Sequence, residues 1–147
     1  MEELLDLHDA IEQGRYEDAL LLVDEMTTMA KKDIVNTIGS FIRVLLIHLI
    51  KSHVEQKMTR SWQVSIRYAL EEIQEKNQRD KADGIYLNAE EVQIVIEKKF
   101  ASACDKASLE SLEGKYSPRE FAKLVDAEAV KAQALDYILN GYPESED

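Results

Sequence analysis

Apolar residues recur every three or four positions along most of the chain, which is the spacing of one face of an α-helix. The first apolar stripe stops at Gly14 and a second begins at Tyr16, so the chain is predicted to start with a helical hairpin. The residues around Gly14 resemble the turn of a tetratricopeptide repeat. No second copy follows, and a stacked array needs about three units, so a repeat protein is excluded.

The segment from Lys31 to about Ser52 is predicted to be one long helix with apolar residues around most of its circumference. Such a helix is typical of the buried centre of a bundle, and it could also pack against a second protomer. Gly39 weakens a helix, so we expect it to admit another backbone at close range. The most apolar run, residues 41–50, is about half as long as a membrane span requires, and no membrane role is expected.

Clear start and stop signals define the remaining helices. A helix is expected from about Thr59 to Gln78, followed by a break at Asp83-Gly84. Capping boxes formed by Asn88 with Glu91 and by Ser117 with Glu120 open two more helices. These end at Gly114 and at Gly141-Tyr142-Pro143. The prediction is an all-α bundle of about six helices, with a single domain over residues 1–143 and a frayed acidic tail over 144–147.

Composition narrows the class of protein. The chain has 147 residues and a net charge of −11, so one domain is expected and a general DNA-coating or membrane-surface role is not. The lone Cys104 excludes an internal disulfide and reads as a small buried hydrophobe. Acidic residues stand where a signal peptide would be basic. A reduced, cytoplasmic protein is therefore expected.

The charge is unevenly distributed along the chain. Residues 1–30 carry nine acids and one base, residues 31–79 carry five acids and nine bases, and residues 80–147 carry fifteen acids and eight bases. The segments therefore have net charges of −8, +4 and −7. The basic middle can balance the acidic flanking helices. Alternatively it forms an anion or RNA contact surface, for which the candidate residues are Lys51, Arg60, Trp62 and Arg67.

Motifs for enzymatic chemistry are missing from the sequence. There is no phosphate-binding glycine loop, no nucleophile elbow and no zinc-binding cysteine pair, and no cofactor is expected. His8 and Glu12 share a helix face, but two ligands do not make a metal site, so none is predicted.

Arg43 and His48 are polar residues within the most apolar run. If Arg43 is buried it needs an acidic partner, for which Asp24 and Glu25 of the hairpin are the candidates. His48 is expected to be a hydrogen-bonded core histidine. An alternative stays open, because this arginine–histidine spacing is similar to the signature of HEPN-type ribonucleases. In that case Arg43 would stabilise phosphate charge and His48 would transfer a proton.

The middle of the chain resembles a known family. The string from Arg43 to Lys51, followed by Arg60-Ser61-Trp62 and Ser65-Ile66-Arg67, is similar to the core signature of the domain-of-unknown-function 29 family, which is abundant in cyanobacteria. The likeness covers about residues 10–115. It implies a helical fold and self-association as a homodimer, and it brings no established activity.

These observations favour a non-enzymatic interaction protein that associates with itself. Its acidic surface suits a basic protein partner, as in an antitoxin-like regulatory pair. The alternatives are the HEPN-like ribonuclease and anion or RNA binding through the basic middle helices.

Overall fold

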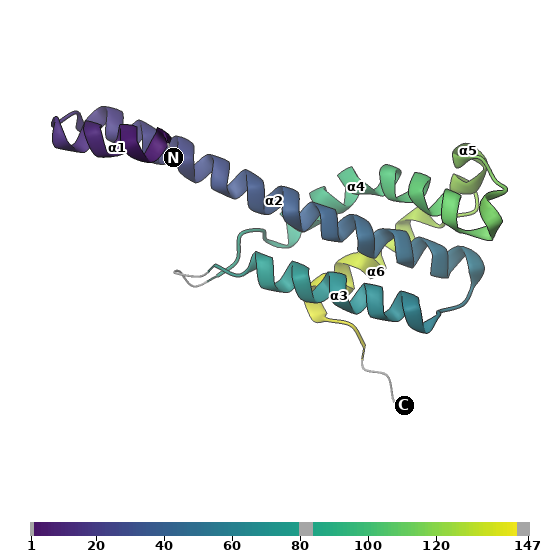
Figure 1. The fold of residues 1–147 in the computed structure, drawn as a ribbon. Helices are drawn as coiled ribbons and strands as arrows, with labels where there is room; N and C mark the ends of the chain where they lie inside the picture. The colour runs from purple at the N-terminus through teal and green to yellow at the C-terminus, as the bar shows by residue number, and fades with distance from the viewer. Residues whose placement is uncertain (1, 80–83, 144–147) are drawn as a thin grey trace. The chain divides into compact units, whose positions relative to one another are not determined.

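The structure, a computed structural model, describes residues 2–79 and 84–143. These residues form six α-helices and one short 3₁₀ helix, and their only β feature is an isolated bridge between Gln78 and Ile85. The all-α prediction is confirmed, whereas the predicted acidic tail lies outside the described residues (Figure 1). The elements are α1 (Glu2–Glu12), α2 (Tyr16–Glu55), α3 (Arg60–Asn77), α4 (Ala89–Glu110), η1 (Leu112–Gly114), α5 (Pro118–Ala122) and α6 (Ala127–Asn140).

The chain divides into two compact units, residues 1–36 and residues 37–147, and the boundary falls within α2. We call them the hairpin unit and the core unit and describe each by itself. The single domain predicted over residues 1–143 remains a prediction.

The hairpin unit consists of α1 and the first part of α2, as the sequence predicts. Gly14 has a φ of +73°, a left-handed conformation that glycine adopts without strain, and it ends α1. The Arg15 amide donates a hydrogen bond of 2.8 Å to the Ala10 carbonyl, and the Arg15 guanidinium pairs with Asp18 at 3.1 Å. These bonds set the turn between the two helices.

Helix α2 is continuous over 40 residues, so the prediction of one helix starting at Tyr16 and another at Lys31 is wrong. The physical reason is that no glycine or proline lies between Gly14 and Gly39, so nothing interrupts the backbone hydrogen bonds. By length and composition, α2 meets the minimum for a membrane span, and 39% of its most apolar window is buried. Its apolar positions from residue 38 onward are those of a core helix.

The C-terminal part of α2 is the centre of the core unit. Six of its apolar side chains are inaccessible to solvent: Ile38, Ile42, Leu45, Leu46, Leu49 and Ile50. Near its end it contacts α4 through Lys51 and Glu110, α6 through His53 and Gln133, and α3 through Trp62 (Figure 1). The predicted central buried helix is therefore confirmed.

The helix starts follow the predicted capping signals with one exception, and the helix expected to reach Gly114 ends earlier, at Glu110, with η1 following it. Asn88 and Glu91, and likewise Ser117 and Glu120, form reciprocal capping boxes at the starts of α4 and α5. The single helix expected after Ser117 is wrong, because it divides into α5 and α6. Asp126 causes the division, since its side chain accepts the Ala129 amide and so begins a new helix.

Gly39 is buried in the core unit, but the neighbour it admits is a side chain. A Cβ at this position would lie 2.9 Å from Cε of Lys99 on α4 and 3.6 Å from Cγ1 of Val95. The expectation that Gly39 admits a second backbone is therefore wrong.

Candidate interaction surface

The hairpin unit buries few apolar side chains completely, although Leu7, Leu22 and Met26 are half-buried. Among its described residues, only Ala10 and Ala19 are buried hydrophobic residues. Eight large apolar side chains are exposed instead, and they are Leu4, Leu5, Ile11, Tyr16, Leu20, Leu21, Val23 and Met29. This number of exposed apolar side chains makes the hairpin unit a candidate contact surface.

One face of α2 in the hairpin unit carries a shallow groove of about 400 Å³, largely open to solvent and lined by residues of this helix alone. Leu21 and Met29, which are 62% and 56% exposed, lie two helical turns apart along it. Asp24, Glu25 and Thr28 occupy the positions between them. The spacings from Leu21 are three, four, seven and eight residues, which place all five side chains on one stripe of the helix. We call these five residues the apolar–acidic stripe.

The carboxylates of this stripe are not compensated by any ion pair among the described residues. Neither Asp24 nor Glu25 forms an ion pair within the described part of the chain, and both are exposed. The Thr28 hydroxyl donates a hydrogen bond of 2.9 Å to the Asp24 carbonyl, so its proton is committed to the backbone. The stripe therefore offers two apolar contacts with two uncompensated negative charges between them.

A second groove, of about 370 Å³, lies between α1 and α2 and shares Leu21 with the first. Three aspartates line it, namely Asp6, Asp9 and Asp18. Arg15 is the one basic residue in its lining and is already paired with Asp18. Negative charge therefore continues from the stripe toward α1.

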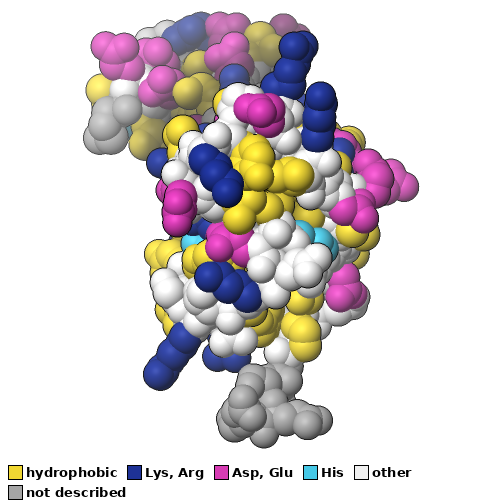
Figure 2. All heavy atoms as spheres, turned by 90° about the vertical axis from the view of Figure 1, so that its right-hand side faces the viewer, with side chains coloured by type: hydrophobic (Ala, Val, Ile, Leu, Met, Phe, Trp, Pro, Cys, Tyr) yellow, Lys and Arg dark blue, Asp and Glu magenta, His cyan; other side chains and the backbone are white. Residues whose placement is uncertain are grey.

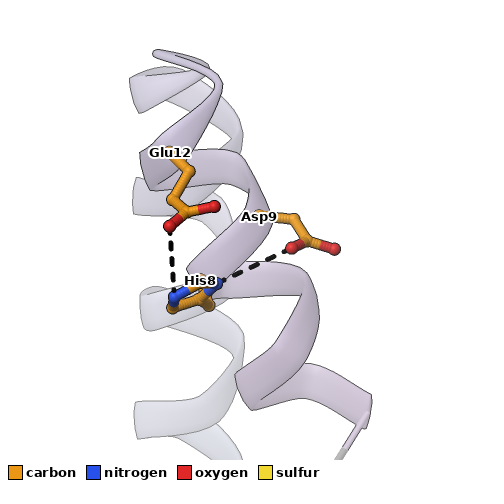
Figure 3. A group of neighbouring side chains, drawn as sticks. All are labelled: His8, Asp9 and Glu12. Atoms are coloured by element: carbon orange, nitrogen blue, oxygen red, sulfur yellow. Dashed lines mark ion pairs between the residues drawn. The ribbon is translucent and has the colours of Figure 1, made fainter.

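His8, Asp9 and Glu12 cluster on the exposed surface of α1. Nε2 of His8 lies 3.6 Å from a Glu12 oxygen, whereas Nδ1 lies 3.7 Å from an Asp9 oxygen. Figure 3 shows that the two ring nitrogens face different carboxylates. One ligand atom from each of the three residues lies within 4.8 Å of the other two, but all three side chains are exposed, and exposed acidic groups gather in this way without an ion.

Arg43 and His48 lie on different parts of the surface of α2. Five residues of helix separate them by about 140° around its axis. Arg43 is exposed, so the burial that would have required an acidic partner from the hairpin does not occur. Arg43 lies on a different face of α2 from the core-facing residues Ile42 and Leu46. The overall apolarity of the segment did not reveal this difference between faces. His48 is half-buried, and its Nδ1 donates a hydrogen bond of 2.8 Å to the Val44 carbonyl.

Of the basic surface predicted from the sequence, the structure brings Lys51 and Trp62 together. The Lys51 ammonium is 2.5 Å from Glu110 and 6.0 Å from the centre of the Trp62 ring, and its side chain is only 10% exposed. The Lys57 ammonium lies 5.8 Å from the same ring. The charge of Lys51 is thus compensated within the core unit, as the charge-balancing alternative predicts. Hydrogen bonding by Lys51 also holds the pKa of the Glu110 carboxyl below its usual range.

Arg60 and Arg67 are exposed on α3, seven residues apart and on one face. Trp62 follows Arg60 by two residues and points away from that face toward the lysines. The Arg67 guanidinium lies 5.4 Å from the centre of the Tyr142 ring. On the face seen in Figure 2, Lys and Arg side chains are scattered among hydrophobic and acidic ones.

The core unit also contains a groove that the sequence reasoning did not find. It measures about 540 Å³ and lies between α3 and the end of α6, with Arg67 and Tyr142 in its lining. Its apolar wall includes Leu70, Ile73 and Leu87. The pairing of these segments depends on tertiary packing, so no sequence signal marks it.

Cys104 is buried in α4, and burial raises the pKa of its thiol. A raised pKa leaves little reactive thiolate at neutral pH, which agrees with its interpretation as a small hydrophobe.

Sequence reasoning placed the candidate site on the basic middle helices and missed the apolar–acidic stripe. One signal was present in the sequence. Residues 16–30 carry apolar side chains on more than one helical face, because Tyr16, Leu20 and Val23 form one stripe whereas Leu21 and Met29 lie on another. The sequence thus carries more apolar surface than one partner helix covers, and in the structure the residues named from both stripes are exposed.

Comparison with known proteins identifies a family. The model of the family described as "Domain of unknown function DUF29" matches residues 9–131, which is most of the chain. This confirms the resemblance found in the sequence and extends it past residue 115, through α5 and into α6. The searches of curated proteins and of solved structures returned no match.

Proposed function

The chain belongs to the DUF29 family, and from that premise we propose that it is a protein-interaction module that binds its partner through the hairpin unit. A single observation carries the proposal: among the described residues of this unit eight large apolar side chains are exposed, whereas the fully buried hydrophobic residues are two alanines. The module has no catalytic role in this proposal. An antitoxin-like regulatory pair in the cytoplasm is one form that such an interaction would take.

Energetics support a binding role for the hairpin unit. Fixing the backbone costs about 1 to 2 kcal/mol per residue, whereas burying a methylene group returns about 0.8 kcal/mol. Two buried alanines with the half-buried Leu7, Leu22 and Met26 offset only part of the cost of ordering α1, whose 11 residues are also shorter than a helix that is stable alone. A partner that covers the exposed leucines supplies the missing apolar burial.

The homodimer expected from the sequence is a second form of the interaction. Residues 1–30 carry a net charge of −8, so two hairpin units placed face to face would repel each other. This charge favours a different protein as the partner. Sedimentation equilibrium of the purified chain distinguishes the two cases directly.

The catalytic and RNA-binding alternatives have weaker support. The ribonuclease alternative requires Arg43 and His48 of two protomers at one phosphate, and Nδ1 of His48 is already hydrogen-bonded to the Val44 carbonyl of its own helix. A surface for anions retains one favourable observation, because Arg60 and Arg67 share an exposed face of α3 and form no ion pair with any described residue.

The proposal is tested by paired substitutions on exposed residues. Leu21→Ser with Met29→Ser removes apolar surface from the hairpin unit, and Val64→Ser with Ile94→Ser removes comparable exposed surface from the core unit. We expect the first pair to abolish recovery of a stoichiometric partner with the native chain and the second to leave it intact. Circular dichroism verifies that both variants are folded.

A second measurement examines the hairpin unit directly. Amide hydrogen exchange of α1 should be fast in the free protein and slow in the complex, while α4 stays protected in both. A partner recovered equally well with both pairs of substitutions would refute the proposal. Strong protection of α1 in the free monomer would also refute it.

A further inference from the structure

We infer that the apolar–acidic stripe, Leu21 to Met29, binds a basic amphipathic helix of another protein, an inference that rests on the interaction role proposed above. The stripe combines exposed leucine and methionine side chains with two carboxylates that no described basic residue neutralises. An apolar groove alone would accept many occupants. The carboxylates restrict the occupant to one that carries positive charge between its apolar side chains.

The geometry of α2 sets the spacing required in the partner. Leu21 and Met29 are eight residues apart, which corresponds to about 12 Å along a helix. A partner helix with apolar residues seven or eight positions apart covers both side chains. Lysine or arginine residues one turn from these anchors then lie opposite Asp24 and Glu25. Methionine adapts its shape to different neighbours, which suits it to the end of such a groove.

Acidic residues outside the stripe also favour a basic partner helix. The groove that continues from Leu21 is lined by Asp6 and Asp9, so a longer basic helix meets further carboxylates there. Other occupants fit less well. A second copy of this chain would bring its own acidic hairpin unit, and anionic lipid or RNA would be repelled.

The test uses two designed peptides and the full-length protein. Both peptides are helices of three heptads with leucine at the a and d positions; one carries lysine at e and g and the other carries glutamate. Binding is measured by fluorescence anisotropy at about 0.15 M salt. We expect the lysine peptide to bind at least tenfold more tightly than the glutamate peptide, and its affinity to fall when salt is raised.

Matched charge variants separate the stripe from the general acidity of the chain. Asp24→Asn with Glu25→Gln should weaken binding of the lysine peptide at least tenfold. Glu71→Gln with Glu75→Gln makes the same change in net charge on exposed positions of α3 and should weaken it less than twofold. Equal effects of the two pairs, or equal binding of the two peptides, would overturn the inference.

The experiments distinguish failure of the basic-helix inference from failure of the proposed interaction role. If Leu21→Ser with Met29→Ser removes the native partner but the lysine peptide does not bind, the basic-helix inference is wrong and the interaction role stands. If those substitutions leave the native partner bound, the interaction role itself is wrong. A homodimer that the same substitutions dissociate would assign the stripe to a second copy and overturn the inference.

Discussion

The two side chains of the Lys51–Glu110 ion pair are buried to different extents, so removing one of them should destabilise the protein more than removing the other. The Lys51 side chain is 10% exposed and the Glu110 side chain is 38% exposed. Glu110→Gln therefore leaves a buried ammonium without its counter-charge, whereas Lys51→Met leaves a carboxylate that water can reach. In Lys51→Met, the Glu110 carboxylate also retains its ion pair with Lys106, at 3.6 Å.

The magnitudes follow from these environments. Breaking a fully buried pair costs about 3 to 5 kcal/mol, and the remaining cation–π contact with Trp62 reduces this, so Glu110→Gln should cost about 2 to 3 kcal/mol. Lys51→Met keeps the apolar stem in place, and its cost should be about 1 kcal/mol or less. The assay is urea unfolding at pH 7, read by circular dichroism. A larger loss of stability for Lys51→Met than for Glu110→Gln would refute the reasoning.

The pair also determines a pH dependence. The hydrogen bond from Lys51 lowers the pKa of Glu110 in the folded state, so the folded protein binds fewer protons than the unfolded chain in mild acid. Its stabilisation is present above the unfolded pKa of about 4.3 and is lost as the pH falls below it. Lys51→Met removes the cause, so the decline in unfolding free energy on the acid side should become shallower than in the wild type. Unchanged slopes would show that Lys51 does not lower this pKa.

Three further predictions concern the core unit. Asn88→Ala and Ser117→Ala each remove a capping box and should each lower the free energy of unfolding by about 1 kcal/mol, measured from urea midpoints; midpoints equal to wild type would contradict the capping assignment. Gly39→Ala should raise stability by up to about 1 kcal/mol, because the new Cβ displaces only the flexible end of Lys99, and a loss of several kcal/mol in the same assay would contradict this. Cys104 should react with a disulfide reagent much more slowly in the folded protein than in urea, and equal rates would show that its thiol is accessible.

Much of the fold could be predicted because its signals are local. The turn at Gly14 and the capping boxes at Asn88 and Ser117 depend on residues within one or two turns of each other. The continuity of α2 and the division at Asp126 were predicted wrongly for a related reason. Charged residues at positions 31–33 resemble a boundary although they do not break a helix, and an aspartate inside an apolar pattern can cap a new one.

The candidate site was less accessible from the sequence. Lys51, Arg60, Trp62 and Arg67 were grouped by sequence proximity, but the fold directs Lys51 inward to Glu110 and separates Trp62 from the arginine face. Which apolar positions stay exposed depends on what packs against them, and this is a tertiary property. The stripe around Leu21 therefore emerged only from the exposure of its side chains in the folded chain.

The exposed apolar residues of the hairpin unit and the buried ones of the core unit are expected to evolve under different constraints. The inaccessible apolar residues of α2 lie from Ile38 onward, within the core unit, whereas Leu21 and Met29 lie in the hairpin unit and are exposed. Substitution of an exposed side chain usually changes the free energy of unfolding by less than about 0.5 kcal/mol. In the proposed binding role, selection therefore acts on these two positions mainly through the partner, and we expect the sequences of homologues to diverge more in the hairpin unit than among the buried residues of the core unit.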